Sequence, residues 1–516
     1  MRVKLAALLL VASPLLAQQQ TSPPGFHLEE TTIAQIHAAM QSGHLTCHAL
    51  VDAYLKRIDA FDKNGPAINA IVQVNPDALK QADDLDRRFA QGGLVGPLHC
   101  VPAIVKDNFE TLGLQSAAGS LSLKGFVSNK DAFQVKRIKD AGAIVLAKSN
   151  MAEFAFSPYE TVNSILPGYT RNPYALDRVT AGSSGGTAAA VAANLGEVGL
   201  GSDTGNSIRG PSSHQALVGI RSTMGLTSRS GVVPLNLLAD IAGPMARSVE
   251  DAVTVFQVIA GEDPDDPATA VSRGRAIPNY RDSLQRDGLR GARIGILRQA
   301  YERPTTDAEV VDVFMAAIDD LKRSGAAIVD PVAVDLGAVQ RPQGSATCGG
   351  FKYDINRYLA AQGARVPVHS LEEIIRSRQF HPSIEARLSS TQEGQENGPG
   401  TAACQAEAEY RQAFRAAVSK TMDSDKLDAF VYPTWSNPPR LIGDLNTPHG
   451  DNSQVFSPTT GWPAIQVPMG YTRGSLPAGI TFFGRAWSEP TLIKFAYAYE
   501  QATHHRHPPA SAPPLR

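Results

Sequence analysis

Short apolar runs alternate with helical patterns along most of this 516-residue chain. Helical spacing begins at Thr31, where apolar residues recur at steps of three and four, and it resumes after Thr46, a good helix cap. The runs that indicate buried strands are residues 68–74, 101–105, 143–146, 294–297, 327–329 and 430–432. Buried strands that alternate with helices predict an α/β fold with a largely parallel or mixed sheet.

The N-terminus has the pattern of a secretory leader. Arg2 and Lys4 precede the apolar run 5–11, and Ala17 stands before three glutamines. We predict a signal peptide over residues 1–17 and a secreted or periplasmic protein; the alternative is an apolar helix packed on the domain. The run is too short to cross a bilayer, and no later stretch approaches ~20 uninterrupted apolar residues, so we expect no membrane span.

The rest of the chain shows few boundaries. Its length admits either three or four domains of about 150 residues or one large α/β unit. We expect a polar lead-in over residues 18–29 and a proline-rich tail over 506–516. Recognisable sequence motifs become sparse around residues 263–425, and we interpret this stretch as a variable insertion that faces the substrate.

Charge and cysteine content exclude several classes. Lys and Arg number 48 against 50 Asp and Glu, a net charge of −2, so no basic excess favours nucleic acid as a partner. The four cysteines form no CxxC pair, which argues against a zinc ribbon or a thioredoxin-like site. No HExxH occurs, so a zinc hydrolase is disfavoured, and we assign no metal ligands. Export would permit one disulfide, whose pairing the spacing leaves open.

Residues 180–213 carry two clusters of glycine and serine, GSSGG at 182–186 and GSDTGNS at 201–207. Glycines allow close backbone approach, so successive N–H groups can converge on one point. A serine there can attack a carbonyl while those N–H groups stabilise the oxyanion. A phosphate loop is excluded because no GxxxxGK[ST] occurs. Two such clusters, separated by one helix-length, indicate a nucleophile segment rather than ordinary turns.

Ser184 is the centre of a competing G-x-S-x-G pattern, the nucleophile elbow of α/β hydrolases. That elbow follows a strand directly, and residues 172–178 lack a strand pattern. An esterase that uses Ser184 is therefore a minor alternative.

Lys106 is the candidate base. It follows the predicted strand 101–105, and the carboxyl ends of buried strands are where α/β sheets place their sites. A lone lysine is usually solvent-exposed. In a cleft, desolvation would instead lower its pKa and let the neutral amine accept a proton near pH 7.

Taken together, these motifs resemble those of the amidase signature family of serine hydrolases. The matches are GSSGG, GSDTGNSIR at 201–209, VPAIVKDN around Lys106, AKSNMAEFAFS from Ala147, TTGWPAIQVPMG from Thr459 and LPAGITFFG from Leu476. The two serines of the pattern, Ser183 and Ser207, lie 24 residues apart, as in the family. The resemblance spans roughly residues 30–500. It implies a mixed central sheet with helices on both faces, a single domain over 30–505, and no metal or organic cofactor.

The resemblance also implies roles for individual residues. Ser207 would be the acylated nucleophile, Ser183 a bridging serine on a cis peptide bond, and Lys106 the terminal base. The oxyanion hole would consist of backbone N–H groups of four consecutive residues, Thr204, Gly205, Asn206 and Ser207.

Three further residues would support this site. Ser184 would help to hold Lys106, while Asp203 and Arg209 would brace the loop. One departure from the family pattern is Asn206, which stands where glycine is usual. Asparagine tolerates a left-handed φ better than most residues, so we expect the loop to survive this change.

We therefore predict an exported amidase that cleaves a linear C–N bond of a small-molecule amide, anilide, carbamate or amidated peptide. A peptide amidase, an aryl acylamidase and a urethanase are open within the family. A tRNA amidotransferase component is disfavoured, because a leader would remove the protein from tRNA. The alternative from another class is a periplasmic solute-binding protein without turnover. The sequence leaves the oligomeric state open.

Overall fold

The computed structural model describes residues 26–337, 339–342 and 348–515. The predicted leader over residues 1–17, and the lead-in up to residue 25, lie outside the described residues. Within the described part of the chain, 11 strands form one sheet in the order β1-β3-β2-β4-β6-β5-β10-β11-β9-β7-β8. In that order the strands are Ile71–Val74, Ile144–Ser149, Pro102–Lys106, Val198–Asp203, Ile241–Ala246, Val218–Arg221, Ala464–Thr472, Leu476–Phe483, Ala429–Pro433, Arg293–Leu297 and Ala327–Val332.

The sheet is mixed. β2 runs parallel to β3 and β4, and β7 runs parallel to β8 and β9, whereas the remaining pairs are antiparallel. The predicted α/β class is confirmed, and each of the six apolar runs contributes a strand. The register of β2 on β4 pairs Val105 with Leu200, which brings the carboxyl ends of these two strands together.

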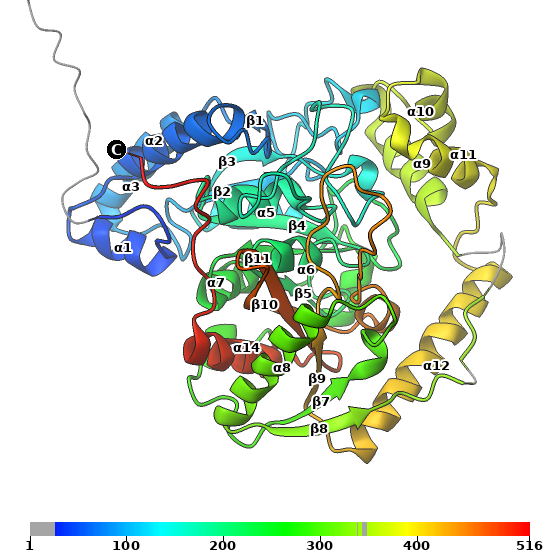
Figure 1. The fold of residues 1–516 in the computed structure, drawn as a ribbon. Helices are drawn as coiled ribbons and strands as arrows, with labels where there is room; N and C mark the ends of the chain where they lie inside the picture. Colours follow the sequence, from blue (N-terminus) through cyan, green and yellow to red (C-terminus); the bar gives the residue numbers. More distant parts are fainter. Residues whose placement is uncertain (1–25, 338, 343–347, 516) are drawn as a thin grey trace, which may run out of the picture.

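Helices cover both faces of the sheet (Figure 1). One face packs against α4 (Phe133–Asp140), α7 (Val249–Ile259), α8 (Ala308–Arg323) and α14 (Glu489–Thr503). The other packs against α3 (Ala78–Gly92), α5 (Gly185–Ala192) and α6 (Arg209–His214), with α1 (Ile33–Gln41) and α2 (Cys47–Ile58) beyond them. None of the described helices is long and apolar enough to cross a membrane.

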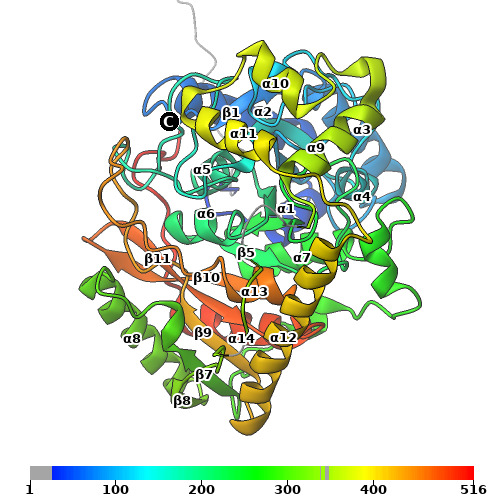
Figure 2. The same ribbon diagram turned by 90° about the vertical axis from the view of Figure 1, so that its right-hand side faces the viewer.

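A group of helices stands apart from the sheet, at the top of Figure 2: α9 (Phe351–Gln362), α10 (Leu371–Ser377) and α11 (Glu385–Glu393). They share an apolar cluster with the loops that follow β2 and β3; the Phe351 ring lies 4.6 Å from that of Phe156. The long helix α12 (Ala402–Ser424) runs from below this group down along the lower half of the sheet, and the short α13 (Phe456–Thr460) packs against it.

The stretch 263–425, interpreted above as one insertion, therefore consists of two different parts. Its first part supplies β7, α8 and β8 to the central sheet, and its second part supplies α9–α12.

Two disulfides join the four cysteines, Cys47 to Cys100 and Cys348 to Cys404. The sequence alone allows for one bond of unknown pairing. The second bond ties the start of the α9–α11 group to α12.

Candidate active site

Lys106, the last residue of β2, is directed toward α5 and α6 by the alternation of the strand. Val105 packs in the core on the α7 face, and Ile104 packs in the core that contains α5, so Lys106 shares the face of Ile104. The side chain is completely buried. Burial lowers the pKa of the Lys106 ammonium to about 7, although the nearby carboxylates of Asp203 and Asp240 oppose this shift. An amine with this pKa can accept a proton at neutral pH.

The Lys106 amine contacts two serines. Nζ lies 2.7 Å from Ser183 Oγ and 2.8 Å from Ser202 Oγ, and it also donates to the Ser202 carbonyl at 3.3 Å. The structure thus brings together the predicted base and the predicted bridging serine. It adds Ser202, to which the sequence motifs assign no role although it lies within GSDTGNS.

The loop that carries Ser183 is packed tightly against residues 157–160. The Gly182–Ser183 peptide bond is cis, as the resemblance implies. The Gly182 N–H donates to the Pro158 carbonyl at 2.8 Å, and a Cβ on Gly182 would lie 2.4 Å from the Ser157 carbonyl oxygen. Glycine is therefore required at position 182 by backbone contact alone.

Ser184 does not hold Lys106 directly. Its hydroxyl donates to the Ser202 carbonyl at 3.2 Å, the same carbonyl that accepts from Lys106, so the two side chains meet only at Ser202. The Ser184 N–H donates to the Ser207 carbonyl at 3.3 Å, which ties the two serine loops together. Any help that Ser184 gives in holding Lys106 therefore runs through the Ser202 carbonyl.

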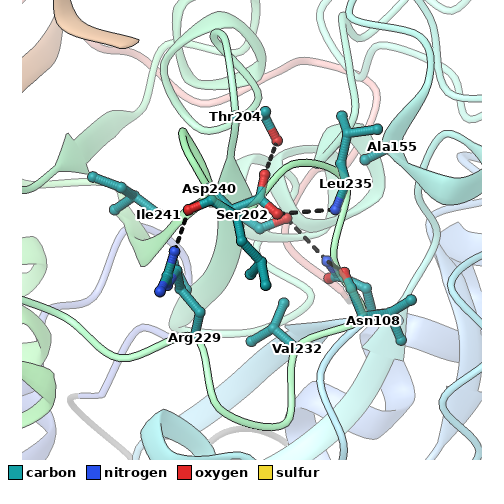
Figure 3. Close-up of a pocket in the computed structure, with 12 residues that line it drawn as sticks. Asn108, Ala155, Ser202, Thr204, Arg229, Val232, Leu235, Asp240 and Ile241 are labelled. Carbon is teal, nitrogen blue, oxygen red and sulfur yellow. Dashed lines mark hydrogen bonds between the residues drawn. The ribbon is translucent and has the colours of Figure 1, made fainter. Parts of the chain in front are cut away.

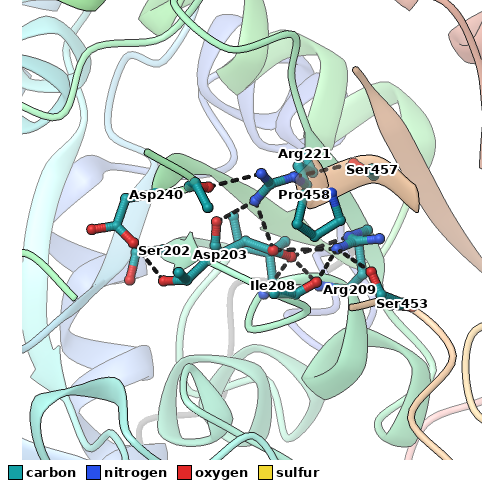
Figure 4. Close-up of polar contacts among 12 residues, drawn as sticks. Ser202, Asp203, Ile208, Arg209, Arg221, Asp240, Ser453, Ser457 and Pro458 are labelled. Atoms are coloured by element: carbon teal, nitrogen blue, oxygen red, sulfur yellow. Dashed lines mark hydrogen bonds and ion pairs between the residues drawn. The ribbon is translucent and has the colours of Figure 1, made fainter. Parts of the chain in front are cut away.

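Asp203, at the end of β4, organises the loop that bears Ser207 (Figure 4). Its carboxylate accepts from the N–H groups of Ile208 and Arg209, and it forms buried ion pairs with Arg209 at 3.1 Å and with Arg221 at 2.9 Å. Burial raises the pKa of the Asp203 carboxyl, but the positive charges of Arg209 and Arg221 outweigh it and bring the pKa to about 2. Arg221, in β5, is not found from the sequence, because no local motif marks it.

The backbone of residues 204–207 leaves hydrogen-bond donors free. Within the described part of the chain, the N–H groups of Gly205, Asn206 and Ser207 make no hydrogen bond to other protein groups. Neither Gly205 nor Asn206 has a positive φ, so the asparagine adopts no left-handed conformation here. The loop thus makes no use of the tolerance of asparagine for a left-handed φ, and no backbone strain arises at this position.

A second group of hydrogen bonds, made by Asp240 and Asn108, holds the end of β4 and the start of the loop that follows it (Figure 3). Thr204 Oγ1 donates to Asp240 at 2.5 Å, and Asp240 also accepts from the N–H groups of Leu235 and Asn236. Asn108 donates to Ser202 Oγ at 3.0 Å. These contacts are not foreseen from the sequence; β6 and the loop before it bring Asp240 against β4.

A cavity of about 750 Å³ opens over Ser207. Its inner wall includes the four predicted oxyanion-hole residues 204–207, and Tyr159 and Glu160 continue it. Its outer wall includes Phe351 and Lys352 of α9, Arg387 and Ser390 of α11, and Glu407, Tyr410 and Arg411 of α12. The second part of the stretch 263–425 thus faces the cavity. No cluster of three or more metal-ligating side chains occurs among the described residues.

Comparison with known proteins identifies the family. A sequence model of the amidase family matches residues 49–493. A probable amidase of Arabidopsis thaliana is 34% identical over 509 residues, which cover 94% of this chain and 92% of the relative. The chain belongs to the amidase signature family. It is therefore an enzyme that hydrolyses amide C–N bonds.

Two further relatives of this amidase indicate the range of the family. The native peptide amidase of Stenotrophomonas maltophilia is 38% identical in sequence and superposes with a TM-score of 0.85. The match covers 93% of this chain and 98% of the peptide amidase. A component of the glutamyl-tRNA(Gln) amidotransferase of Acinetobacter baumannii is 33% identical over 498 residues, covering 92% of this chain and 96% of the relative. The similarity extends over almost the whole length of each.

Proposed function

We propose that this amidase hydrolyses the carboxamide of amidated peptides or amino acid amides through an acyl-Ser207 intermediate. The observation that carries the proposal is the 2.7 Å contact of the buried Lys106 amine with Ser183, on a loop bonded to that of Ser207. This arrangement supplies a base, a bridging hydroxyl and a nucleophile next to free backbone donors.

In the acylation step, Ser207 Oγ forms a bond to the substrate carbonyl carbon. Its proton passes to Ser183 Oγ, and the proton of Ser183 passes to the neutral Lys106 amine. Electron density moves onto the carbonyl oxygen, where the free N–H groups of residues 205–207 stabilise the oxyanion. When the tetrahedral species collapses, the C–N bond breaks, and the Lys106 proton returns through Ser183 to the leaving nitrogen.

Deacylation repeats the sequence with water as the nucleophile. Water loses a proton along the same route as its oxygen bonds to the acyl carbon, and Ser207 regains a proton when the ester bond breaks. The products are the carboxylic acid and ammonia or an amine. A pKa near 7 suits Lys106 to both acylation and deacylation, because the amine must accept a proton and return it in each of these steps.

Peptide-like substrates are favoured by two observations. The cavity of about 750 Å³ is much larger than a simple carboxamide requires. The peptide amidase of Stenotrophomonas maltophilia shares 38% of its residues with this chain over nearly the full length of both.

We also infer that the enzyme is exported. The predicted leader over residues 1–17 is one reason. The pairing of all four cysteines in two disulfides is another, because structural disulfides persist mainly in oxidising compartments. Expression of the full chain in a bacterium tests this inference: we expect a protein that begins at Gln18 outside the cytoplasm. An uncleaved cytoplasmic chain would contradict it.

The activity test uses protein that starts at Gln18, together with its Ser207→Ala and Ser184→Ala variants. Amidated peptides, primary amides, anilides and carbamates are offered while ammonia or amine release is followed. We expect amidated peptides to be the best substrates, Ser207→Ala to lose turnover, and Ser184→Ala to retain most of it. Turnover that survives in Ser207→Ala but not in Ser184→Ala would transfer the nucleophile to Ser184. Binding without turnover in the unaltered protein would favour a solute-binding role.

A further inference from the structure

Glu160 lies on the cavity wall beside the serine loops. The segment 157–160 is held against the cis peptide by the bond from Gly182 N–H to the Pro158 carbonyl. A Cβ on Gly182 would lie 2.9 Å from the Glu160 carbonyl oxygen, so the Glu160 backbone directly abuts the loop of Ser183. Glu160 also lines the cavity that contains Ser207.

The Glu160 carboxylate has no partner among the described residues. It takes part in no ion pair or side-chain hydrogen bond there, and its Oε2 atom is buried without a donor. Burial raises the pKa of this carboxyl, and the charge of Arg440 acts in the opposite direction. Arg440 makes no ion pair with it; the guanidinium donates to the Thr447 carbonyl and lies 5.5 Å from the centre of the Tyr159 ring.

Four of the five other charged groups of the described cavity wall are already engaged; the fifth, Arg341, is exposed and forms no ion pair with Glu160. Glu407 is paired with Arg411 at 2.6 Å. Lys352 donates to two backbone carbonyls at the end of α11, and Arg387 donates to the Phe156 carbonyl and lies over the Phe156 ring. Of the two carboxylates on the described cavity wall, Glu160 is thus the one that lacks a partner. A desolvated carboxylate is stable when a donor, best a charged one, meets it.

We propose that Glu160 binds a positively charged amino group of the substrate, so that the preferred substrates are amides that carry an ammonium group. This inference rests on the proposed function, since it names the substrate class of the same site. The ammonium can be the free α-amino group of an amino acid amide or a lysine-like side chain. Either supplies charged N–H donors to the carboxylate beside the scissile bond.

Two pairs of probes isolate the charge. Lysine amide with an acetylated α-amino group is compared with N-acetyl norleucinamide, and leucinamide is compared with N-acetyl leucinamide. In at least one pair we expect the cationic member to have about tenfold higher kcat/KM. The loss of a hydrogen bond to a charged group typically weakens binding by about this factor. Glu160→Gln should reduce this preference to within about twofold, and Glu160→Asp should keep part of it.

Glu407→Gln is the matched control, because it removes a carboxylate of the same wall that already has a partner. The preference for the cationic probe should persist in that variant. The proposal is overturned if neither pair shows a charge preference, or if Glu160→Gln leaves the preference as it was. Thermal unfolding of each variant shows whether a change in kinetics reflects a change in fold.

Calorimetric binding of the same probes to Ser207→Ala separates this inference from the proposed function. A charge preference in binding that disappears in the Ser207→Ala, Glu160→Gln double variant supports the role of Glu160 even where no turnover occurs. Turnover of all probes without any charge preference supports the amidase chemistry and rejects the role of Glu160.

Discussion

The Lys106 amine and the Ser183 hydroxyl lie 2.7 Å apart although 77 residues separate them in the chain. The sheet accounts for this contact. β2 ends at Lys106 beside the parallel strand β4, and the loop that precedes α5 crosses the same end of the sheet. A buried amine with a pKa of about 7 is thereby placed within hydrogen-bonding distance of two serine hydroxyls and the Ser202 carbonyl.

The first prediction concerns the pH dependence of activity. Only the neutral Lys106 amine accepts a proton, so kcat/KM should rise with pH through an inflection near 7 and level off above it. Lys106→Met should lower kcat/KM by about 10²–10⁴-fold at pH 8, the usual contribution of a general base. The measurement is a pH–rate profile on an amidated peptide. A profile that stays flat from pH 5.5 to 9 would show that Lys106 is not the base.

Thermal unfolding of the same variant provides a control for folding. In the unfolded chain the lysine pKa is about 10.4, well above its value in the fold. Between these two pKa values, folding must release a proton from Lys106, so its contribution to stability improves as pH rises from 7 to 10. Lys106→Met should therefore raise Tm at pH 7, and this gain should shrink toward pH 10.

The second prediction concerns Asp203. Asp203→Asn would leave the buried guanidinium groups of Arg209 and Arg221 without their carboxylate, which typically costs about 3–5 kcal/mol. We expect a large fall in Tm and loss of turnover, because the Ile208 and Arg209 N–H groups that shape the loop also lose an acceptor. A variant with unchanged Tm would show that this network does not hold the loop that bears Ser207.

The same carboxylate gives the enzyme a defined acid sensitivity. The folded pKa of Asp203 is about 2, below the ~3.9 of an unfolded aspartate, so its stabilising contribution is complete above pH 4 and is lost as pH falls toward 2. The Tm difference between the unaltered protein and Asp203→Asn should therefore narrow between pH 4 and pH 2.

Particular residues show what the sequence could and could not predict. The apolar, branched run before Lys106 predicts β2, but β4 is missed because its sequence, VGLGSD, consists mostly of small residues. The reason is contact with α5: a Cβ on Gly199 would lie 2.4 Å from the Thr187 methyl group. The sequence accordingly presents residues 201–203 as loop, although they complete the strand.

The same distinction holds for the site. Lys106, Ser183 and Ser207 stand in local motifs, whereas Arg221 and Asp240 reach the loop only through the pairing of β5, β6 and β4. Nothing in the sequence around either residue marks such a contact. The unpartnered carboxylate of Glu160 likewise depends on where every other charge of the cavity lies.

The third prediction concerns Asn206, the departure from the family pattern. Its side chain is fully buried, and neither carboxamide atom has a hydrogen-bond partner in the described structure. Asn206→Gly removes no hydrogen bond and relieves the burial of two unpartnered polar atoms, which offsets the entropy cost of glycine of about 1 kcal/mol. We expect Tm to change by a few degrees or less and turnover of amidated peptides to stay within about tenfold. A much larger loss of kcat/KM with unchanged Tm would show that the carboxamide itself contacts the substrate.

The last prediction compares the two disulfides. They close loops of similar length, with sequence separations of 53 and 56 residues, so chain entropy alone predicts that each contributes about 4 kcal/mol. Their positions differ. Cys47 and Cys100 are buried behind the sheet, whereas the bond of Cys348 to Cys404 spans the helices of the outer cavity wall.

Paired serine substitutions should therefore separate stability from substrate binding. Cys47→Ser with Cys100→Ser should lower Tm and leave KM for an amidated peptide nearly unchanged, because that bond is remote from the cavity. Cys348→Ser with Cys404→Ser should raise KM severalfold as well, since α9 and α11 would lose their covalent tie to α12. For a small primary amide, which needs little of the outer wall, KM should change much less. Equal effects of the two double variants on KM for both substrates would show that the outer wall keeps its position through packing alone.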